Sequence, residues 1–293
     1  MKLTLMQVLH LTPGLRGFAR QIHPYWFFRT TLASVTLANR VWPHTRKLCR
    51  PFSAVLGERF DRRELRKREN RYLLFLRLFK DLVPAWTNWE WRHHDWVSVE
   101  GEDNLKQALQ QGRGAVLISG HNYGFGRLVA PALSLRGYRV KRGGGGKKGN
   151  ERIARWRHKD DLGWQYLNYK GDYWHRLEVL KSIRDALKRN EVVHISPRAY
   201  RQGAVETEIE LLNRKFFLDP TWFRMIKICR VPVLPCFAIG DINGRIKIII
   251  HRPLGASGKS MAKEFGDILI HYLTEYPEFG RMWKAISLQR EHW

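Results

Sequence analysis

From Trp96 onward, short apolar runs alternate with amphipathic stretches, and this alternation restricts the fold more than any other feature. Runs such as GAVLISGH (114–121) and EVVHIS (191–196) are too short for typical helices and almost wholly apolar, as expected for strands buried on both faces. In the segment 175–190, apolar residues instead recur at helical spacing, so that four of them share one face of a helix: Leu177, Leu180, Ile183 and Leu187. Buried strands that alternate with helices predict an α/β fold with a mixed, mostly parallel sheet flanked by helices.

The remaining elements follow the same reading. Further strands are expected in 96–101, 138–142, 164–169, 205–213, 231–240 and 244–252, the last two forming a hairpin across Asn243-Gly244. Further helices are expected in 102–113, 125–137, 151–163 and 216–230, and the tail 260–283 closes with one more. Gly112 and Gly137 mark two helix ends.

Residues 1–92 form a helical, basic region in front of this α/β domain, which spans residues 93–293. The segment 59–71 is dense in Arg and Lys and leads into the apolar helix-like run 71–83. Such a basic stretch is either a solvated helix face or a surface that docks on anionic lipid, so we predict a membrane-associating region here. No run of eighteen apolar residues occurs, which argues against a membrane-spanning helix.

The charge balance points to a polyanionic partner. The chain has 52 Lys and Arg against 27 Asp and Glu, a formal net charge of +25. An anionic membrane surface and nucleic acid both fit such a surplus. The 12 tryptophans favour the membrane, because indole rings settle at the lipid–water boundary, although aromatic rings also stack on bases. Cys49, Cys229 and Cys236 have no metal-binding spacing and suit a reducing cytoplasm.

Candidate site residues follow the predicted strands, because ligands of open α/β sheets gather at the carboxyl ends of strands. Four such ends are informative: His121, Lys141–Gly146, Ser196–Arg201 and Pro235–Cys236. Together they supply one imidazole and many cations but few acids, which suits an acyl- or phosphate-bearing substrate and a proton-abstracting histidine. By contrast, His194 lies within an apolar strand and is expected to be a hydrogen-bonded core histidine.

The order of several segments along the chain resembles the lysophospholipid acyltransferase superfamily, in particular the bacterial lipid A (lauroyl/myristoyl) acyltransferases. The segments that carry the resemblance run from about Arg62 to Trp283: WVSVEGEDNLKQALQQGRGAVLISGH, GYRVKR, EVVHIS, FFLDPTWFRMIKICRVPVLP and YPEFGRMW. The resemblance implies an acyltransferase at the cytoplasmic face of the bacterial inner membrane, bound peripherally. Pro277, Glu278 and Trp283 match the closing segment and are interpreted as structural.

The superfamily has a histidine followed five positions later by Asp or Glu. The resemblance implies that His121 takes the proton from an acceptor hydroxyl, which then attacks a thioester of coenzyme A or acyl carrier protein. Gly126 stands where the acid belongs, and neither Phe125 nor Arg127 replaces it. A second departure is Arg198, which stands where related chains carry an acid, whereas Arg201 agrees with the pattern.

The resemblance and the positions of the cations imply substrate- or phosphate-binding roles for a set of residues: Lys141, Arg142, Arg198, Arg201 and Asn122. Three carboxylates on other segments are candidates to replace the missing acid: Glu151, Asp160 and Glu206. No metal or prosthetic group is expected, with acyl-CoA or acyl carrier protein as co-substrate. Three hypotheses remain open: an acyltransferase with a lipid-like acceptor, a catalytically impaired relative that binds acyl donor or lipid without turnover, and a nucleic-acid-binding protein, which rests on the charge alone.

Overall fold

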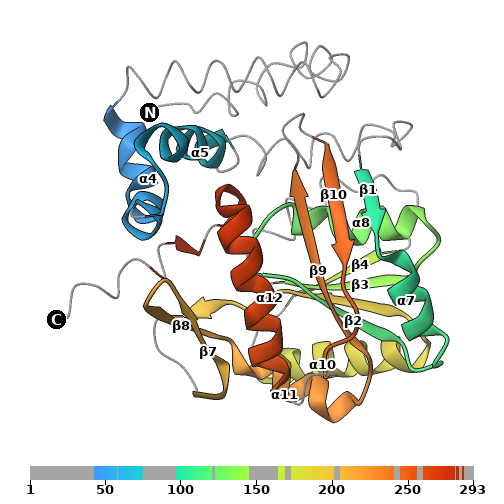
Figure 1. The fold of residues 1–293 in the computed structure, drawn as a ribbon. Coiled ribbons are helices and arrows are strands. Elements are labelled where there is room, and N and C mark those ends of the chain that lie inside the picture. The colour runs from blue at the N-terminus through green and yellow to red at the C-terminus, as the bar shows by residue number, and fades with distance from the viewer. Residues whose placement is uncertain are drawn as a thin grey trace, which may run out of the picture.

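The computed structural model describes residues 43–57, 59–74, 97–120, 123–144, 164–168, 173–200, 205–240, 245–255, 260–280, 282, 283 and 286. In these residues a seven-stranded sheet has the order β1-β10-β9-β2-β5-β3-β4 (Figure 1). Its strands are β1 (Val97–Glu100), β2 (Ala115–Ile118), β3 (Val140–Gly144), β4 (Trp164–Asn168), β5 (Val192–Ile195), β9 (Val233–Gly240) and β10 (Ile246–Ile250). Neighbouring strands are parallel except for β9 and β10, which confirms the mixed, mostly parallel sheet.

Helices cover the sheet, and a small second sheet lies beside it (Figure 1). The helices are α4 (Pro43–Leu56), α5 (Arg62–Leu74), α7 (Glu102–Leu109), α8 (Val129–Leu135), α10 (Tyr173–Lys188), α11 (Pro220–Cys229) and α12 (Met261–Glu275). Short 3-10 turns are η3 (Gly126–Leu128), η4 (Val205–Thr207) and η5 (Pro277–Phe279). The second sheet has the order β6-β8-β7, with β6 (Ala199–Tyr200), β7 (Glu208–Leu211) and β8 (Arg214–Leu218).

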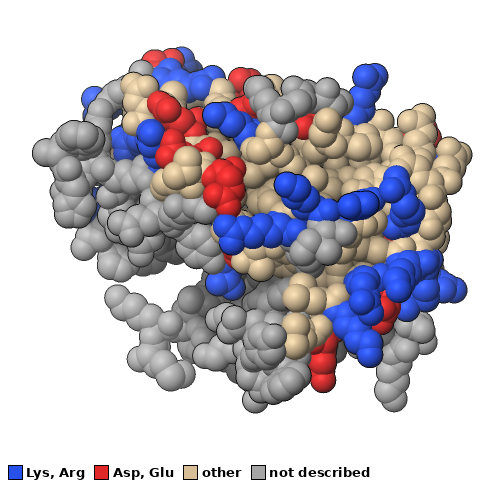
Figure 2. Space-filling model, turned by 90° about the horizontal axis from the view of Figure 1, so that it is seen from below, with Lys and Arg blue, Asp and Glu red and all other residues tan. Residues whose placement is uncertain are grey.

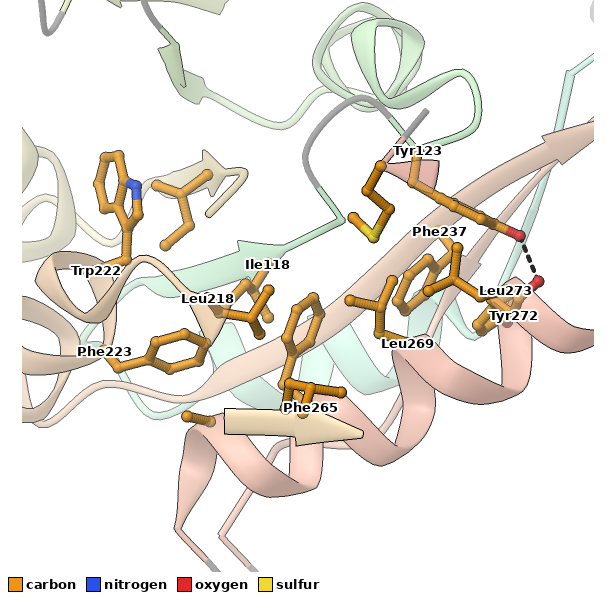
Figure 3. Packing of buried hydrophobic residues seen from close by; sticks show 14 of the residues in the cluster. Ile118, Tyr123, Leu218, Trp222, Phe223, Phe237, Phe265, Leu269, Tyr272 and Leu273 are labelled. Atoms are coloured by element: carbon orange, nitrogen blue, oxygen red, sulfur yellow. Dashed lines mark hydrogen bonds between the residues drawn. The ribbon is translucent and has the colours of Figure 1, made fainter. Parts of the chain in front are cut away.

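Two hydrophobic cores lie on opposite faces of the large sheet, because successive side chains of a strand point to opposite sides. In β2, Val116 and Ile118 belong to the first core, which α10, α11, α12 and the small sheet complete. Figure 3 shows part of this core, with aromatic rings from α11, α12 and β9 packed together. Ala115 and Leu117 face the second core, which α7 and α8 complete.

The N-terminal helices α4 and α5 pack against the closing segment of the chain. Phe52 stacks on Tyr72 at a ring-centroid distance of 4.9 Å and meets Trp283 edge-on at 5.7 Å. Trp283 is fully buried and donates its indole N–H to the Pro277 carbonyl at 2.9 Å, while the Glu278 side chain is also buried. This confirms the structural interpretation of Pro277, Glu278 and Trp283. The boundary at residues 92 and 93 stays a prediction, since residues 75–96 lie outside the described residues.

The predictions for three segments were wrong in part. Residues 216–218, expected at the start of a helix, belong to β8, and α11 begins only at Pro220, with Asp219 as its N-cap. The strand expected over 205–213 is confined to β7, because residues 205–207 form η4. On α10, Leu177 is exposed, and Val179 is buried in its place. The helix expected at 151–163 and the turn at Asn243-Gly244 lie outside the described residues.

Two further observations concern earlier expectations. In the described parts of the chain, no helix combines the length and the apolar character needed to cross a bilayer. Cys229 and Cys236 are both free thiols, and burial raises the pKa of each above its ordinary value. Cys236 is fully buried in β9, where it belongs to the second core.

Candidate active site

The strand order brings the predicted strand ends to one edge of the sheet. Strands β9, β2, β5 and β3 are consecutive and parallel, so the carboxyl ends of β2, β5 and β3 lie at the same edge. Pro235 and Cys236 do not end a strand as expected: β9 continues to Gly240, because pairing with β10 extends it beyond its pairing with β2. The candidate site is therefore formed around the ends of β2, β5 and β3.

Several predicted site residues lie outside the described residues: His121, Asn122, Glu151, Asp160 and Arg201. Their roles stay predictions. The structure does describe the chain on both sides of His121 and Asn122, and it describes Lys141, Arg142, Arg198 and Glu206.

The chain before and after His121 is held by backbone hydrogen bonds. Before it, Ser119 donates its N–H to the Ile195 carbonyl at 3.0 Å. After it, the N–H of Tyr123 donates to the Gly120 carbonyl at 3.1 Å, and the N–H of Phe125 donates to the Ala238 carbonyl at 2.7 Å. The two residues between Gly120 and Tyr123 thus join two fixed points of the fold.

The Tyr123 side chain adds a third anchor, which reaches α12. Its hydroxyl donates to the Tyr272 carbonyl at 2.7 Å (Figure 3) and lies 3.0 Å from the Tyr276 carbonyl. The ring is buried and meets Phe237 edge-on at 5.7 Å. Burial, with the nearby Glu278 carboxylate as a second cause, raises the pKa of Tyr123 well above 10, so this phenol stays protonated. Tyr123 therefore has the properties of an anchor and not of an acid catalyst.

Three polar side chains are packed together at the ends of β2 and β5: Ser119, His194 and Ser196, here called the Ser–His cluster. Ser119 Oγ lies 2.9 Å from His194 Nε2 and 2.8 Å from Ser196 Oγ. Leu117, the register partner of His194, faces the second core, so the His194 ring lies on the α7–α8 side of the sheet. Ser119 and His194 are almost completely buried, at 2% and 0% exposed.

His194 is a buried, neutral imidazole. Its Nδ1 is buried and has no hydrogen-bond partner among the described residues, which corrects the expectation of a fully hydrogen-bonded core histidine. Burial lowers the pKa of His194 well below 6.5, and the positive charge of Arg142 lowers it further. Arg142 is the register partner of His194 on β3 and is only partly buried. The neutral imidazole of His194 and the positive charge of Arg142 therefore lie side by side at this edge of the sheet.

Comparison with known proteins identifies the family of the chain. Residues 52–277 match the sequence model of the bacterial lipid A biosynthesis acyltransferases. The chain belongs to this family. The matched residues include the large sheet, most of the first core, the buried residues of the second core and the segment that carries His121. No curated protein matches the chain. Membership of the lipid A biosynthesis acyltransferase family supports an acyltransferase activity in general.

The structure shows what surrounds the position where the superfamily pattern places its acid. Gly126 begins η3, and a β-carbon built on it would lie 3.6 Å from Ser119 Oγ, with no closer described atom. Its φ is outside the left-handed region, so another residue fits here without backbone strain. Position 126 therefore points at the Ser–His cluster.

Two other predicted residues lie at the surface. Glu206, a candidate replacement acid, accepts a hydrogen bond from Arg224 at 2.6 Å, and this bond is the first cause of its lowered pKa. Arg198 is exposed, and its carbonyl accepts the N–H of Asp219 at 2.9 Å. Lys141 and Arg142 lie on β3, where both side chains are partly buried.

A basic surface lies at the opposite edge of the sheet. Figure 2 shows this underside, where blue Lys and Arg side chains predominate over red acidic ones. Exposed basic residues of α10, α11 and the turns before β5 and β9 include Lys181, Arg184, Lys188, Arg189, Lys227 and Arg230. These turns lead into parallel strands of the sheet, and the candidate site lies around the other ends of β2, β5 and β3. The basic underside and the site therefore lie at opposite ends of the parallel strands.

Sequence reasoning missed Ser119 and Tyr123 as members of the site. Ser119 had a signal, because it is the first polar residue after the apolar run of β2. Tyr123 had none, since its partners are carbonyls near the end of α12, about 150 residues away.

Proposed function

We propose that the chain transfers a fatty acyl group from acyl-CoA or acyl carrier protein to a hydroxyl or amine of a lipid-like acceptor, with His121 as general base. The match to the acyltransferase family over residues 52–277 carries this proposal. Further support comes from the sequence position of His121, three residues after the end of β2, and from two cations on the same parallel sheet: Arg142 lies on β3, and Arg198 follows β5.

In the proposed reaction, His121 takes the proton of the acceptor hydroxyl while the oxygen attacks the thioester carbonyl. The carbonyl oxygen then carries a negative charge, which Arg142, Arg198 and Arg201 stabilise, or they hold a phosphate of the donor or acceptor. The tetrahedral intermediate collapses, the carbon–sulfur bond breaks, and the leaving thiolate takes the proton back from the imidazolium.

Gly126 gives a specific reason to keep a second candidate function, a catalytically impaired relative that binds acyl donor or lipid. Loss of the acid that orients the histidine of a hydrolase triad lowers turnover on the order of 10⁴-fold without abolishing it. An amine acceptor needs less deprotonation than a hydroxyl and suits the remaining histidine better.

Purified protein incubated with long-chain acyl-CoA and a lysolipid distinguishes the two functions. We expect thioester loss that depends on acceptor and falls at least tenfold in His121→Ala. His271→Ala is the matched control, because His271 is an exposed histidine on α12. Equal thioester loss in wild type and His121→Ala would refute the general base. Binding of acyl-CoA without turnover would favour the impaired relative.

We further propose that the protein acts peripherally at an anionic membrane, at the cytoplasmic face of the bacterial inner membrane. The net charge of +25 and the exposed basic residues of α5 support this: Arg62, Arg63, Arg66 and Lys67. Each such residue contributes on the order of 1 kcal/mol near an anionic surface at moderate ionic strength.

Vesicle flotation tests the membrane proposal. Binding to anionic phosphatidylglycerol vesicles should exceed binding to neutral vesicles and should weaken with salt. A triple Gln variant of α5 at Arg63, Arg66 and Lys67 should release the protein. A variant with the same charge loss on α10, at Lys181, Arg184 and Lys188, should stay bound. Tight, salt-sensitive oligonucleotide binding without vesicle binding would point to nucleic acid instead.

A further inference from the structure

We propose that one exposed face of α10 is a docking site for a soluble protein, which contacts it through a helix that carries acidic side chains. The face consists of four residues, here called the α10 stripe: Leu177, Lys181, Arg184 and Lys188. They follow one another at intervals of four, three and four residues, so they lie on one side of the helix. All four are exposed. This role goes beyond the proposed acyl transfer.

Leu177 gives the stripe an apolar contact at one end. Its sequence spacing predicted a buried residue, but the side chain is 38% exposed, whereas Ile183 on the same helix is fully buried. A single exposed leucine is ordinary on a protein surface. Here, however, it lies in line with three cations, and an apolar anchor beside charged residues is typical of the contact between two proteins.

The three cations of the stripe are available to a partner. Within the part of the chain that the structure describes, no carboxylate lies within ion-pair distance of Lys181 or Lys188. Arg184 lies 3.8 Å from Asp185, and its side chain remains well exposed. From Lys181 to Lys188 the helix rises about 10 Å. A partner helix along α10 can place carboxylates on one side every three or four residues and so can meet all three cations.

The surroundings of the stripe extend the basic surface and hold it in place. In the turn that follows α10, Asn190 Oδ1 accepts the N–H of Gly114 at 2.9 Å. Arg113, next to Gly114, donates from Nη1 to the Arg230 carbonyl at 3.0 Å. The turns before β2, β5 and β9 are therefore tied together. Because the stripe leads into this fixed platform, a partner that binds it orders little of this chain.

The charge pattern of α10 favours a protein over a uniformly anionic partner. Glu178 is exposed and Asp185 partly exposed, and both lie on α10 beside the stripe. The phosphates of nucleic acid or of a lipid surface meet these two carboxylates as like charges, whereas a protein can place a carboxylate opposite each cation and avoid each acid. The stripe itself contains no aromatic residue to insert at a lipid boundary or to stack on a base.

The position of α10 indicates that the partner is soluble. In Figure 1, α5 lies above the large sheet and α10 below it. When α5 contacts a membrane, α10 therefore stays accessible from the aqueous phase. This one step rests on the proposed membrane contact of α5, which vesicle flotation tests separately.

Fluorescence anisotropy with the full-length chain tests the α10 stripe. The probe is a labelled, stapled helical peptide whose glutamates and leucine have the spacing of the stripe, and a scrambled peptide of the same composition is its control. We expect the chain to bind the ordered peptide about tenfold more tightly than the scrambled one. Replacement of the three basic residues of the stripe by Gln should lower the affinity about tenfold, since exposed ion pairs contribute little each. Leu177→Ala should lower it about threefold.

The triple Gln variant of α5 at Arg63, Arg66 and Lys67 is the matched control. It removes the same charge at another place and should bind the peptide as wild type does. Reversal of charge gives the decisive result: with Glu at the three basic positions of the stripe, the chain should lose the acidic peptide and bind a peptide with lysines in place of the glutamates. Circular dichroism confirms that each variant folds.

Four outcomes would overturn the inference. Equal loss of affinity in the α5 and α10 variants, or equal binding of the ordered and scrambled peptides, would show attraction by net charge alone. Tighter binding of a duplex oligonucleotide, lost in the α10 variant, would assign the stripe to nucleic acid. Loss of vesicle binding in the α10 variant would assign it to the membrane. Self-association in light scattering that Leu177→Ala abolishes would assign it to a second copy of this chain.

Discussion

Arg68 Nη1 lies 3.1 Å from Glu278 Oε2, and the two residues are 210 positions apart in the sequence. The Glu278 side chain is only 6% exposed, and Arg71 Nη1 approaches its other oxygen at 3.5 Å. This pairing holds α5 against η5, which directly follows the Tyr272 and Tyr276 carbonyls that lie next to the Tyr123 hydroxyl. The N-terminal helices are thereby connected to the segment that follows His121.

Glu278→Gln should lower the free energy of unfolding by about 2 kcal/mol, because it removes charge-assisted hydrogen bonds from a buried carboxylate. Urea unfolding at pH 7 measures the change. Glu275→Gln is the matched control: Glu275 is 52% exposed and pairs with Arg59 at 3.7 Å. Its loss should cost less than about 1 kcal/mol, since exposed ion pairs contribute little. Equal losses in the two variants would show that the Glu278 pairing does not fix α5.

Gly124 should tolerate no larger residue, because its backbone and its surroundings both exclude a side chain. Its φ is +54°, and an added β-carbon would lie 1.9 Å from the Ala238 carbonyl oxygen. Gly124→Ala should therefore lower the free energy of unfolding by more than the roughly 1–2 kcal/mol that left-handed backbone alone costs. The chain near His121 would also shift, so acyl transfer should fall with stability.

Gly112→Ala separates the two causes. Gly112 has a similar φ of +70°, but nothing lies within 4 Å of its added β-carbon. Gly112→Ala should lower the free energy of unfolding only by the cost of the left-handed backbone. The difference in free energy of unfolding between Gly124→Ala and Gly112→Ala then measures the clash with Ala238. Similar losses at both positions would mean that the loop after His121 moves to accept a β-carbon.

The sequence predicted the large sheet well because its buried strands carry an almost continuous apolar signal. It failed where local signals conflicted. Phe216 and Leu218 read as the beginning of an apolar helix, yet Asp219-Pro220 is a helix start, and the residues before it pair as β8. Leu212 and Asn213, both at positive φ, form the turn between β7 and β8. That turn lacks the Asn-Gly signal that usually reveals a hairpin.

The sequence could predict at which edge of the sheet the candidate site lies, but not which side chains contact one another there. Alternation of strands and helices placed His121 just after one predicted strand and Arg142 at the end of another. Periodicity cannot show that Ser119 and His194, which are 75 positions apart, share a hydrogen bond. Nor can it show that the missing side chain at Gly126 faces that pair. Such relations depend on strand order and register, which the chain fixes only through long-range packing.

The neutral state of His194 should make the protein less stable as the pH falls below about 6.5. Burial and the charge of Arg142 hold the pKa of His194 well below 6.5 in the folded state, whereas in the unfolded chain it returns to its ordinary value. Below that value the unfolded state binds a proton that the folded state does not, so acid favours unfolding. Burial also lowers the pKa of His251, which adds a contribution of the same sign.

His194→Gln isolates the contribution of His194, because glutamine is polar, can still bond to Ser119 and does not titrate. Urea unfolding at pH 7.0 and pH 5.5 gives the loss of stability on acidification for each protein. From an unfolded pKa near 6.5, one proton corresponds to about 1 kcal/mol over this interval, so the variant should lose about that much less than wild type. Equal losses in the two proteins would mean that His194 accepts a proton in the folded state, which would require an anionic or solvated partner at Nδ1.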